Sequence, residues 1–283
     1  MKWRMFICAI CFLIGGCSLN IPLEDQFSDP DAITDVLSAR SLLASAYKAM
    51  PQQIFQLSVL SDDFCPSQHL NKDMSLQGLY NWREVEMTEL AGTLWAGYYA
   101  VIAEVNALLA RIDAVVTLDE TEKLEKMRIV CEAKALKSWC YFDLLRLFAP
   151  RYEGNENKDG IILKKRVELD FLPRSSVKEC VTEIRTLLNE ARNVDNTQKN
   201  VYWLSDKAVA YLQVELELYA GNYPAVLELT KDLETEYPES VLGADVYKYL
   251  WSSENSDARI FGKYQLEQIY MDIRFDTFEK GDY

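Results

Sequence analysis

Two long amphipathic segments between Leu94 and Ala149 constrain the fold of this chain more than any other feature of its sequence. In the first segment, apolar residues recur every three or four positions, which places them on one stripe of a helix. The stripe consists of Trp95, Tyr98, Ile102, Val105, Leu109 and Ile112. We expect a stripe of this length to be buried against other elements.

The second segment carries two apolar rows rather than one. The first row is Leu124, Met127, Cys131, Ala135, Ser138, Phe142 and Leu145, and the second is Leu136, Cys140, Leu144 and Leu147. A helix with two apolar faces needs neighbours on both sides, as in a bundle or a stacked helical array. Thr117 and Glu120 have the spacing of a capping box that starts this helix, and Pro150 would end it. The two segments therefore predict a helical hairpin packed between other elements.

Further helices are predicted on both sides of the hairpin. Asp31 to Met50 has a helical stripe, and Ser176 with Glu179 forms a second capping box ahead of another helix. Ser205 to Pro238 predicts a compact helix-turn-helix around Gly221-Asn222-Tyr223-Pro224, close to the spacing of tetratricopeptide repeats. An ordinary helical hairpin is the alternative for that segment. The fold class is therefore mostly all-α, with stacked helical hairpins and irregular loops.

The charge of the chain argues against a nucleic-acid partner. Its 283 residues include 30 Lys and Arg against 44 Asp and Glu, which gives a formal net charge of -14. Proteins that bind nucleic acids neutralise phosphates with clustered Lys and Arg, and an acidic surface opposes this.

The N-terminus has the pattern of a secretory signal. Two basic residues precede an apolar run from Met5 to Ile14, which is too short for a bilayer core that needs about 20 residues. Gly15-Gly16-Cys17 resembles the bacterial lipobox, in which the cysteine is lipidated and becomes the first mature residue. Residues 1–16 are then the signal peptide, and 17–30 are a lipidated tether. The alternative is an ordinary signal peptide with an incidental cysteine.

The remaining cysteines do not require a disulfide. Cys131 and Cys140 lie about 13 Å apart along one predicted helix, too far for a bond, and are interpreted as small buried apolar residues. A bridge between Cys65 and Cys180 would be possible in an oxidising compartment, although nothing in the sequence demands it.

Several short blocks occur in an order that resembles a known family. They are the lipobox-like Cys17, Ala44-Ser45-Ala46-Tyr47, Trp95-x-x-Tyr98-Tyr99-x-x-Ile102, Asn106-x-Leu108-Leu109, Glu132 to Ser138, Tyr141-Phe142-x-Leu144, Pro173 to Val177, Glu190-Ala191 and Arg259-Ile260-Phe261. In this order they resemble the SusD/RagB family, nutrient-uptake lipoproteins that accompany TonB-dependent transporters in the outer membrane of Bacteroidota. The chain departs from the family at Lys137-Ser138, where an Arg-Ala pair is usual.

The resemblance implies a SusD-like helical domain over residues 31–283. Family members are commonly longer, so most of the family's C-terminal region is expected to lie outside this chain. The resemblance also implies a protein on the cell surface, anchored by lipid on Cys17, that captures an oligosaccharide or another nutrient. The captured ligand would pass to a SusC-like TonB-dependent transporter. It implies no cofactor and no metal.

The segment from Ser61 to Arg83 has no helical period and is predicted to be a long loop, a kind of segment that is often functional. Sugar binding, which the resemblance implies, uses flat aromatic faces together with carboxylates and amides. The loop holds this mixture. The candidate ligand-binding residues are Asp62, Asp63, Asn71, Tyr80, Asn81, Trp82 and Arg83. The alternative is that Trp82 packs back on the domain. Trp95 and Trp139 have helical spacing and are interpreted as core, while Trp203 and Trp251 are left open.

An enzyme is the rival from another class, but no catalytic residue is predicted. Asp62 and Asp63 are adjacent, so on an extended segment they point apart and cannot flank one glycosidic bond. The single histidine, His69, excludes a zinc H-E-x-x-H motif, and neither G-x-S-x-G nor a nucleotide-binding fingerprint occurs. A tetratricopeptide-type adaptor that binds a protein segment is the second alternative.

Overall fold

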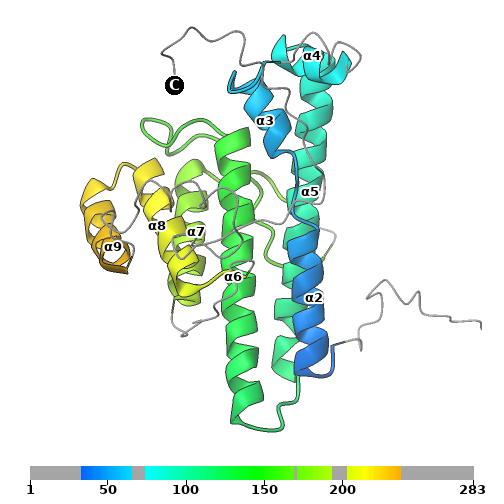
Figure 1. Cartoon of the computed structure of the whole chain (residues 1–283), viewed down its shortest axis with the longest axis vertical. Coiled ribbons are helices and arrows are strands. Elements are labelled where there is room, and N and C mark those ends of the chain that lie inside the picture. The colour runs from blue at the N-terminus through cyan, green and yellow to red at the C-terminus, as the bar shows by residue number, and fades with distance from the viewer. Residues whose placement is uncertain (1–32, 66–73, 169–170, 193–202, 237–283) are drawn as a thin grey trace, which may run out of the picture.

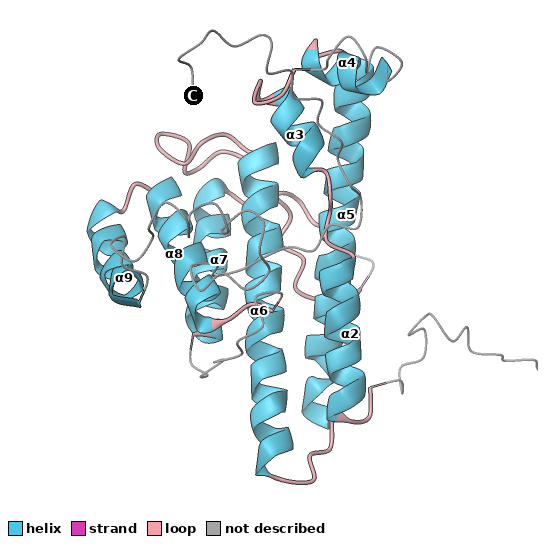
Figure 2. Ribbon diagram, viewed as in Figure 1, coloured by secondary structure: helices cyan, strands magenta, loops and turns pink. Residues whose placement is uncertain are grey.

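The computed structural model describes residues 33–65, 74–168, 171–192 and 203–236, and within these ranges it is mostly helical (Figures 1 and 2). The elements in chain order are α2 (Val36–Lys48), α3 (Ile54–Leu60), α4 (Met74–Tyr80), α5 (Glu84–Arg111), the 3-10 turn η2 (Ile112–Ala114), α6 (Glu120–Phe148), α7 (Val177–Ala191), α8 (Asp206–Tyr219) and α9 (Tyr223–Glu236). The described ranges hold no β-strand, only an isolated bridge between Asp159 and Ser176.

The long helix α6 lies in the middle of the array, as its two apolar rows predict. It packs against α2 and α5 on one side and against α7 and α8 on the other (Figure 1). Fully buried side chains come from both rows, among them Ala135 and Leu145 of the first and Leu136, Cys140 and Leu144 of the second. The prediction of a hairpin enclosed between other helices is therefore confirmed.

Three members of the predicted rows are exposed instead of buried. Leu124 is 49%, Met127 43% and Leu147 39% exposed. Figure 1 shows that the N-terminal part of α6 extends beyond the end of α7, so Leu124 and Met127 have no neighbouring helix on that side. A sequence stripe predicts a direction around the helix, but not how far the neighbouring helices reach.

The observed helix ends correct two predictions. Helix α5 begins at Glu84, well before Leu94, and α6 is capped by Asp119 rather than by Thr117. The Asp119 carboxylate accepts the backbone N–H of Glu122 at 2.8 Å. Asp and Thr are both favourable N-cap residues, so the sequence alone does not choose between positions two residues apart. Helix α6 ends at Phe148, before Pro150, as predicted.

The two later helical predictions hold. Ser176 and Glu179 form the predicted capping box of α7, in which each side chain accepts the other residue's backbone N–H. Helices α8 and α9 form the predicted hairpin, and Gly221 supplies the left-handed turn between them with φ of 71°. This turn favours glycine because a Cβ destabilises that conformation.

By length and composition, α5 with η2 is the one helix in the described ranges that could cross a membrane. Its apolar residues, however, are used inside the protein. Tyr98, Val101, Ile102 and Val105 are buried in the core, and the helix packs against α2 and α6. We therefore interpret α5 as an interior helix of the array.

A buried ion-pair network joins α2 to α6. The Arg40 guanidinium donates to Glu132 at 2.8 Å and also contacts Glu125, and the Glu132 side chain is fully buried. Arg40 also lies over the Trp203 ring, 4.9 Å from its centroid. The Trp203 ring in turn meets Tyr47 edge-on at 5.1 Å. The sequence did not decide between a core and a surface position for Trp203. In the structure it packs against Arg40 and Tyr47 of α2 and so has a structural role.

A second buried network surrounds Lys137, where the chain departs from the pattern that it otherwise resembles. Its ammonium donates to Asn106 Oδ1 at 2.6 Å. Asn106 and Tyr141 both donate to the backbone carbonyl of Lys164, at 2.9 and 2.6 Å. These contacts fasten the irregular segment after α6 to the helical core.

The described cysteines Cys65, Cys131, Cys140 and Cys180 are all free thiols. Cys131 and Cys140 are buried, as predicted. Cys180 is buried beside Gly160 and Ile161, whereas Cys65 is exposed, so the two do not form the bridge that the sequence would have allowed. The proposed signal peptide, the tether and Cys17 lie outside the described residues.

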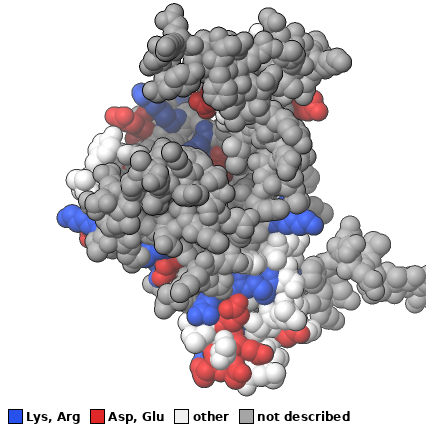
Figure 3. All heavy atoms as spheres, viewed as in Figure 1, with Lys and Arg blue, Asp and Glu red and all other residues white. Residues whose placement is uncertain are grey.

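Acidic side chains gather at the end of the molecule where α6 begins, next to a few Lys and Arg side chains (Figure 3). Asp113, Asp119 and Glu120 are exposed at this junction. The concentration agrees with the acidic composition of the chain.

Candidate functional site

The candidate residues that the structure describes lie at the C-terminal ends of two short helices, at one end of the molecule. Helices α3 and α4 pack against each other, and α4 also packs against α5 (Figure 1). The predicted long loop from Ser61 to Arg83 is therefore partly wrong, because Met74–Tyr80 is helical. Seven residues form only two helical turns, too few for apolar periodicity to be recognised. The site consists of two helix ends instead of one loop.

The end of α3 places Asp62 in an unusual backbone conformation. Its φ is 66°, in the left-handed region. The Asp62 N–H bonds the Val59 carbonyl at 3.3 Å and the Asp63 N–H bonds the Ser58 carbonyl at 2.9 Å. This pair of bonds is a Schellman ending, in which the left-handed position is usually glycine.

The end of α4 repeats the arrangement with Trp82. Its φ is 55°, its N–H bonds the Leu79 carbonyl at 3.0 Å, and the following Arg83 N–H bonds the Gly78 carbonyl at 2.9 Å. A residue with a Cβ loses about 1–2 kcal/mol in this conformation. The arrangement directs the chain sharply from α4 into α5 and leaves the Trp82 side chain 59% exposed.

Asp62 and Trp82 are the two non-glycine residues with positive φ in the described ranges; the others are Gly154 and Gly221. Both belong to the predicted site. Backbone strain of this kind is retained only where the surroundings enforce it, and it concentrates at binding and catalytic sites.

The Tyr80 hydroxyl has two neighbours from the chain after α3, the Cys65 thiol and the Asp62 carboxylate. A hydrogen bond with Cys65 is the main cause that raises the pKa of Tyr80, and the negative charge of Asp62 adds to it. Asp63 accepts the Ser61 hydroxyl at 2.8 Å. The structure thus brings the end of α3 and the end of α4 together, as one surface.

Two neighbours of this surface were missed by the sequence reasoning. Phe64 is 39% exposed and its ring lies 5.7 Å from that of Phe55. Glu86, in the first turn of α5, covers Gly78 so closely that a Cβ there would clash with the Glu86 carboxyl group. Its Oε1 is 3.8 Å from Arg83, while Oε2 is buried and has no hydrogen-bond partner among the described residues. The spacing of Arg83 and Glu86 would have been the available signal.

The structure places the other candidates as follows. Arg83 is exposed at the start of α5, and Asn81 donates its side-chain amide to the Gln77 carbonyl at 2.7 Å. Asn71, Cys17 and Trp251 lie outside the described residues. Trp95 and Trp139 pack against the core, as predicted. We define the α3–α4 surface as Asp62, Asp63, Tyr80, Trp82 and Arg83.

The α3–α4 surface offers an aromatic face, two carboxylates, a phenol and a guanidinium, which can stack on a ring and bond its hydroxyl groups. Among the described residues no group of three or more His, Cys, Asp or Glu side chains is arranged to hold a metal ion.

With this geometry established, comparison with known proteins identifies the family. The model of the SusD-like family, described as starch-binding and associating with the outer membrane, matches residues 23–215. This chain belongs to the SusD-like family. The match includes α2 to α7 and most of α8, and therefore the whole α3–α4 surface. Comparison with curated proteins finds no match.

Solved structures share the fold. A SusD-like carbohydrate-binding protein from Bacteroides vulgatus is 16% identical with a TM-score of 0.64, over 81% of this chain and 51% of that one. A laminarin-binding SusD-like protein is 19% identical with a TM-score of 0.59, over 80% and 50%. Surface glycan-binding protein A from Bacteroides fluxus is 17% identical with a TM-score of 0.56, over 81% and 50%. The chain spans about half the length of each of these structures.

Proposed function

We propose that this protein is a cell-surface lipoprotein that binds an oligosaccharide and passes it to a TonB-dependent outer-membrane transporter, without chemistry of its own. Membership of the SusD-like family supports the proposal. So do two structural neighbours, one described as binding laminarin and the other as a surface glycan-binding protein. The sugar site is proposed on the α3–α4 surface because the Trp82 side chain is exposed there, at a helix ending with a left-handed backbone conformation.

Trp82 would provide the stacking face of the α3–α4 surface. The apolar face of a pyranose ring packs against an indole, and the ring hydroxyls point to the side, where carboxylates accept them. Asp62 and Asp63 stand at the neighbouring helix end. Arg83 would donate to hydroxyl or ring oxygens.

The test is affinity electrophoresis of the protein in gels containing plant, host or microbial polysaccharides, one per gel. We expect at least one polysaccharide to retard the protein, and Trp82→Ala to abolish the retardation. Phe171→Ala is the matched control, because Phe171 is fully exposed elsewhere on the chain. Retardation that survives Trp82→Ala would remove the site from the α3–α4 surface.

The lipid anchor rests on the sequence. Residues 1–16 are proposed as the signal peptide, 17–30 as the tether, and Cys17 as the lipidated residue. In a detergent phase-separation assay, Cys17→Ala is expected to move the protein from the detergent phase, where membrane-attached proteins collect, to the aqueous phase. Attachment as strong as in the unmodified protein would contradict a lipid on Cys17.

A protein-interaction adaptor is the second candidate, favoured by the open face of α9. Tyr223 and Leu227 lie one helical turn apart there and are 63% and 66% exposed. If this face binds the transporter, Leu227→Asp should prevent co-purification of the two proteins while glycan retardation stays intact. An adaptor without a glycan site would show the first effect and bind none of the polysaccharides.

A further inference from the structure

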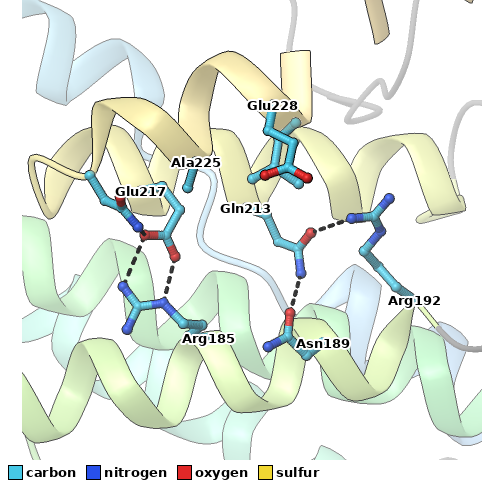
Figure 4. Close-up of a pocket in the computed structure, with 9 residues that line it drawn as sticks. Arg185, Asn189, Arg192, Gln213, Glu217, Ala225 and Glu228 are labelled. Atoms are coloured by element: carbon cyan, nitrogen blue, oxygen red, sulfur yellow. Dashed lines mark hydrogen bonds and ion pairs between the residues drawn. The ribbon is translucent and has the colours of Figure 1, made fainter. Parts of the chain in front are cut away.

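A pocket of about 420 Å³ opens between α7, α8 and α9, among elements remote in sequence from the α3–α4 surface (Figure 4). Helix α8 forms its floor with Gln213 and Glu217, both 5% exposed. Helix α7 forms one wall and α9, with the turn before it, the other. The lining residues are Arg185, Asn189, Arg192, Gln213, Glu217, Asn222, Ala225, Glu228 and Leu229.

The floor and the α7 wall are locked together by hydrogen bonds (Figure 4). Arg185 holds Glu217 through two bonds of 2.5 and 3.0 Å. Gln213 accepts from Arg192 at 3.1 Å and donates to the Asn189 side-chain oxygen at 2.7 Å. These polar groups are therefore positioned before any ligand arrives, which lowers the entropic cost of binding.

The pocket is electrically balanced although the protein carries a net charge of -14. Two guanidinium groups, of Arg185 and Arg192, face two carboxylates, of Glu217 and Glu228. Glu217 is already neutralised by Arg185, and this pair lowers the pKa of Glu217 against the opposing effect of burial. The groups left to a ligand are N–H donors of Arg192 and Asn189 on α7 and the Glu228 carboxylate, which approaches from α9 (Figure 4).

We propose that this pocket binds one or two residues of an uncharged saccharide, as a second sugar site in addition to the α3–α4 surface; the inference rests on the proposed function. A sugar hydroxyl both donates and accepts, so neighbouring hydroxyls on one ring can bond Glu228 and the α7 donors together. An anion would be repelled by Glu228 and a cation by Arg192. Ala225 and Leu229 supply the apolar contact for ring C–H groups.

The hydrogen-bonding character also predicts how this site differs from the first one. None of the described residues that line the pocket is aromatic, so binding depends on polar contacts and not on stacking. Its volume lies at the small end of the usual range for ligand pockets, about 300–1,000 Å³. The site would therefore hold one or two residues of a longer chain.

The test follows the side-chain amide signals of Asn189 and Gln213 by NMR of the isotope-labelled protein. The neutral probes are laminarihexaose, maltohexaose, xylohexaose and mannohexaose, added one at a time. The acidic probe is trigalacturonate and the basic probe is chitotriose without acetyl groups. At least one neutral probe should shift both amide signals, and the shifts should persist in Trp82→Ala, because the first site is separate.

Glu228→Ala should weaken the binding measured from these shifts about tenfold, since it removes a hydrogen bond to a charged group. Glu120→Ala is the control and should leave the affinity unchanged. It removes the same charge from the N-terminal end of α6, outside the pocket, where the side chain is 84% exposed. Stronger binding of the acidic or basic probe than of every neutral one would overturn the proposal.

The remaining outcomes separate this inference from the proposed function. If a neutral probe binds at Trp82 and moves neither amide signal, the second site is refuted while the proposed function stands. If the amide signals move but no polysaccharide depends on Trp82, the pocket stands and the α3–α4 surface is wrong. Amide shifts caused by a short peptide and by none of the sugars would make the pocket a protein-docking groove.

Discussion

Replacing Lys137 by methionine is expected to remove a pH dependence from the stability of this protein. Lys137 is 4% exposed on α6, and its ammonium donates a hydrogen bond to Asn106 Oδ1. Burial lowers the pKa of its ammonium to about 8 from the ordinary value of 10.5, and the nearby Glu183 charge opposes that effect. Between these two values the unfolded chain holds the proton and the folded chain does not, so the free energy of unfolding rises with pH.

The size of the effect follows from the two pKa values. A difference of 2.5 pH units corresponds to a penalty of about 3 kcal/mol at pH 7, where both states are protonated. Raising the pH to 9.5 relieves about 2 kcal/mol of it. Methionine keeps the length of the side chain and does not titrate. At pH 7 the variant therefore avoids the ionisation penalty and should gain stability over the original protein. This gain is reduced by about 1–3 kcal/mol, because the Asn106 oxygen loses its hydrogen-bond partner.

The assay is urea unfolding followed by circular dichroism at several pH values from 7 to 9.5. The buried thiols of Cys131 and Cys180, whose pKa is raised by burial, oppose the trend in both proteins and cancel in the difference. The stability of the original protein relative to Lys137→Met should therefore increase by about 2 kcal/mol over this range. A difference in the free energy of unfolding between the two proteins that does not change with pH would refute the lowered pKa of Lys137. Lys123→Met is the control, since that side chain is 60% exposed on the same helix.

Three other substitutions test the structure. Trp82→Gly should be more stable in thermal unfolding than Trp82→Ala by about 1 kcal/mol, because only glycine fits the left-handed position without cost; equal stabilities would contradict the strain. Arg40→Ala should cost about 3–5 kcal/mol in urea unfolding, because it removes the cation that faces the buried Glu132 carboxylate, and a loss below 1 kcal/mol would refute that network. Gly160→Ala should cost about 1–3 kcal/mol, since its Cβ would lie 3.0 Å from the Ser175 carbonyl oxygen. An unchanged midpoint of urea unfolding would show that the backbone around residue 160 shifts to make room for the methyl group.

The long helices were predictable because their apolar rows extend over many turns. Rows of that length identify a buried direction on α5 and α6. They do not show where neighbouring helices stop, which is why Leu124 and Met127 were wrongly placed in the core. The seven-residue helices α3 and α4 give no usable period, so the segment that contains α4 was interpreted as loop.

The candidate site was predictable in its residue types and not in its geometry. An aromatic and acidic segment indicated Trp82 and Asp62, but a left-handed conformation at residues other than glycine leaves no signal in sequence. Glu86 was missed because α5 was expected to begin only at Leu94. The α7–α9 pocket depends on three helices meeting in space, so its polar residues form no motif along the chain.

The most direct test of sugar capture is acrylamide quenching of tryptophan fluorescence, with and without the polysaccharide that retards the protein. Trp82 is 59% exposed, whereas Trp95, Trp139 and Trp203 are partly buried. We expect that the bound glycan shields the protein from acrylamide and that Trp82→Phe removes this protection. Binding of the glycan with unchanged quenching, or protection that persists in Trp82→Phe, would contradict capture at the α3–α4 surface.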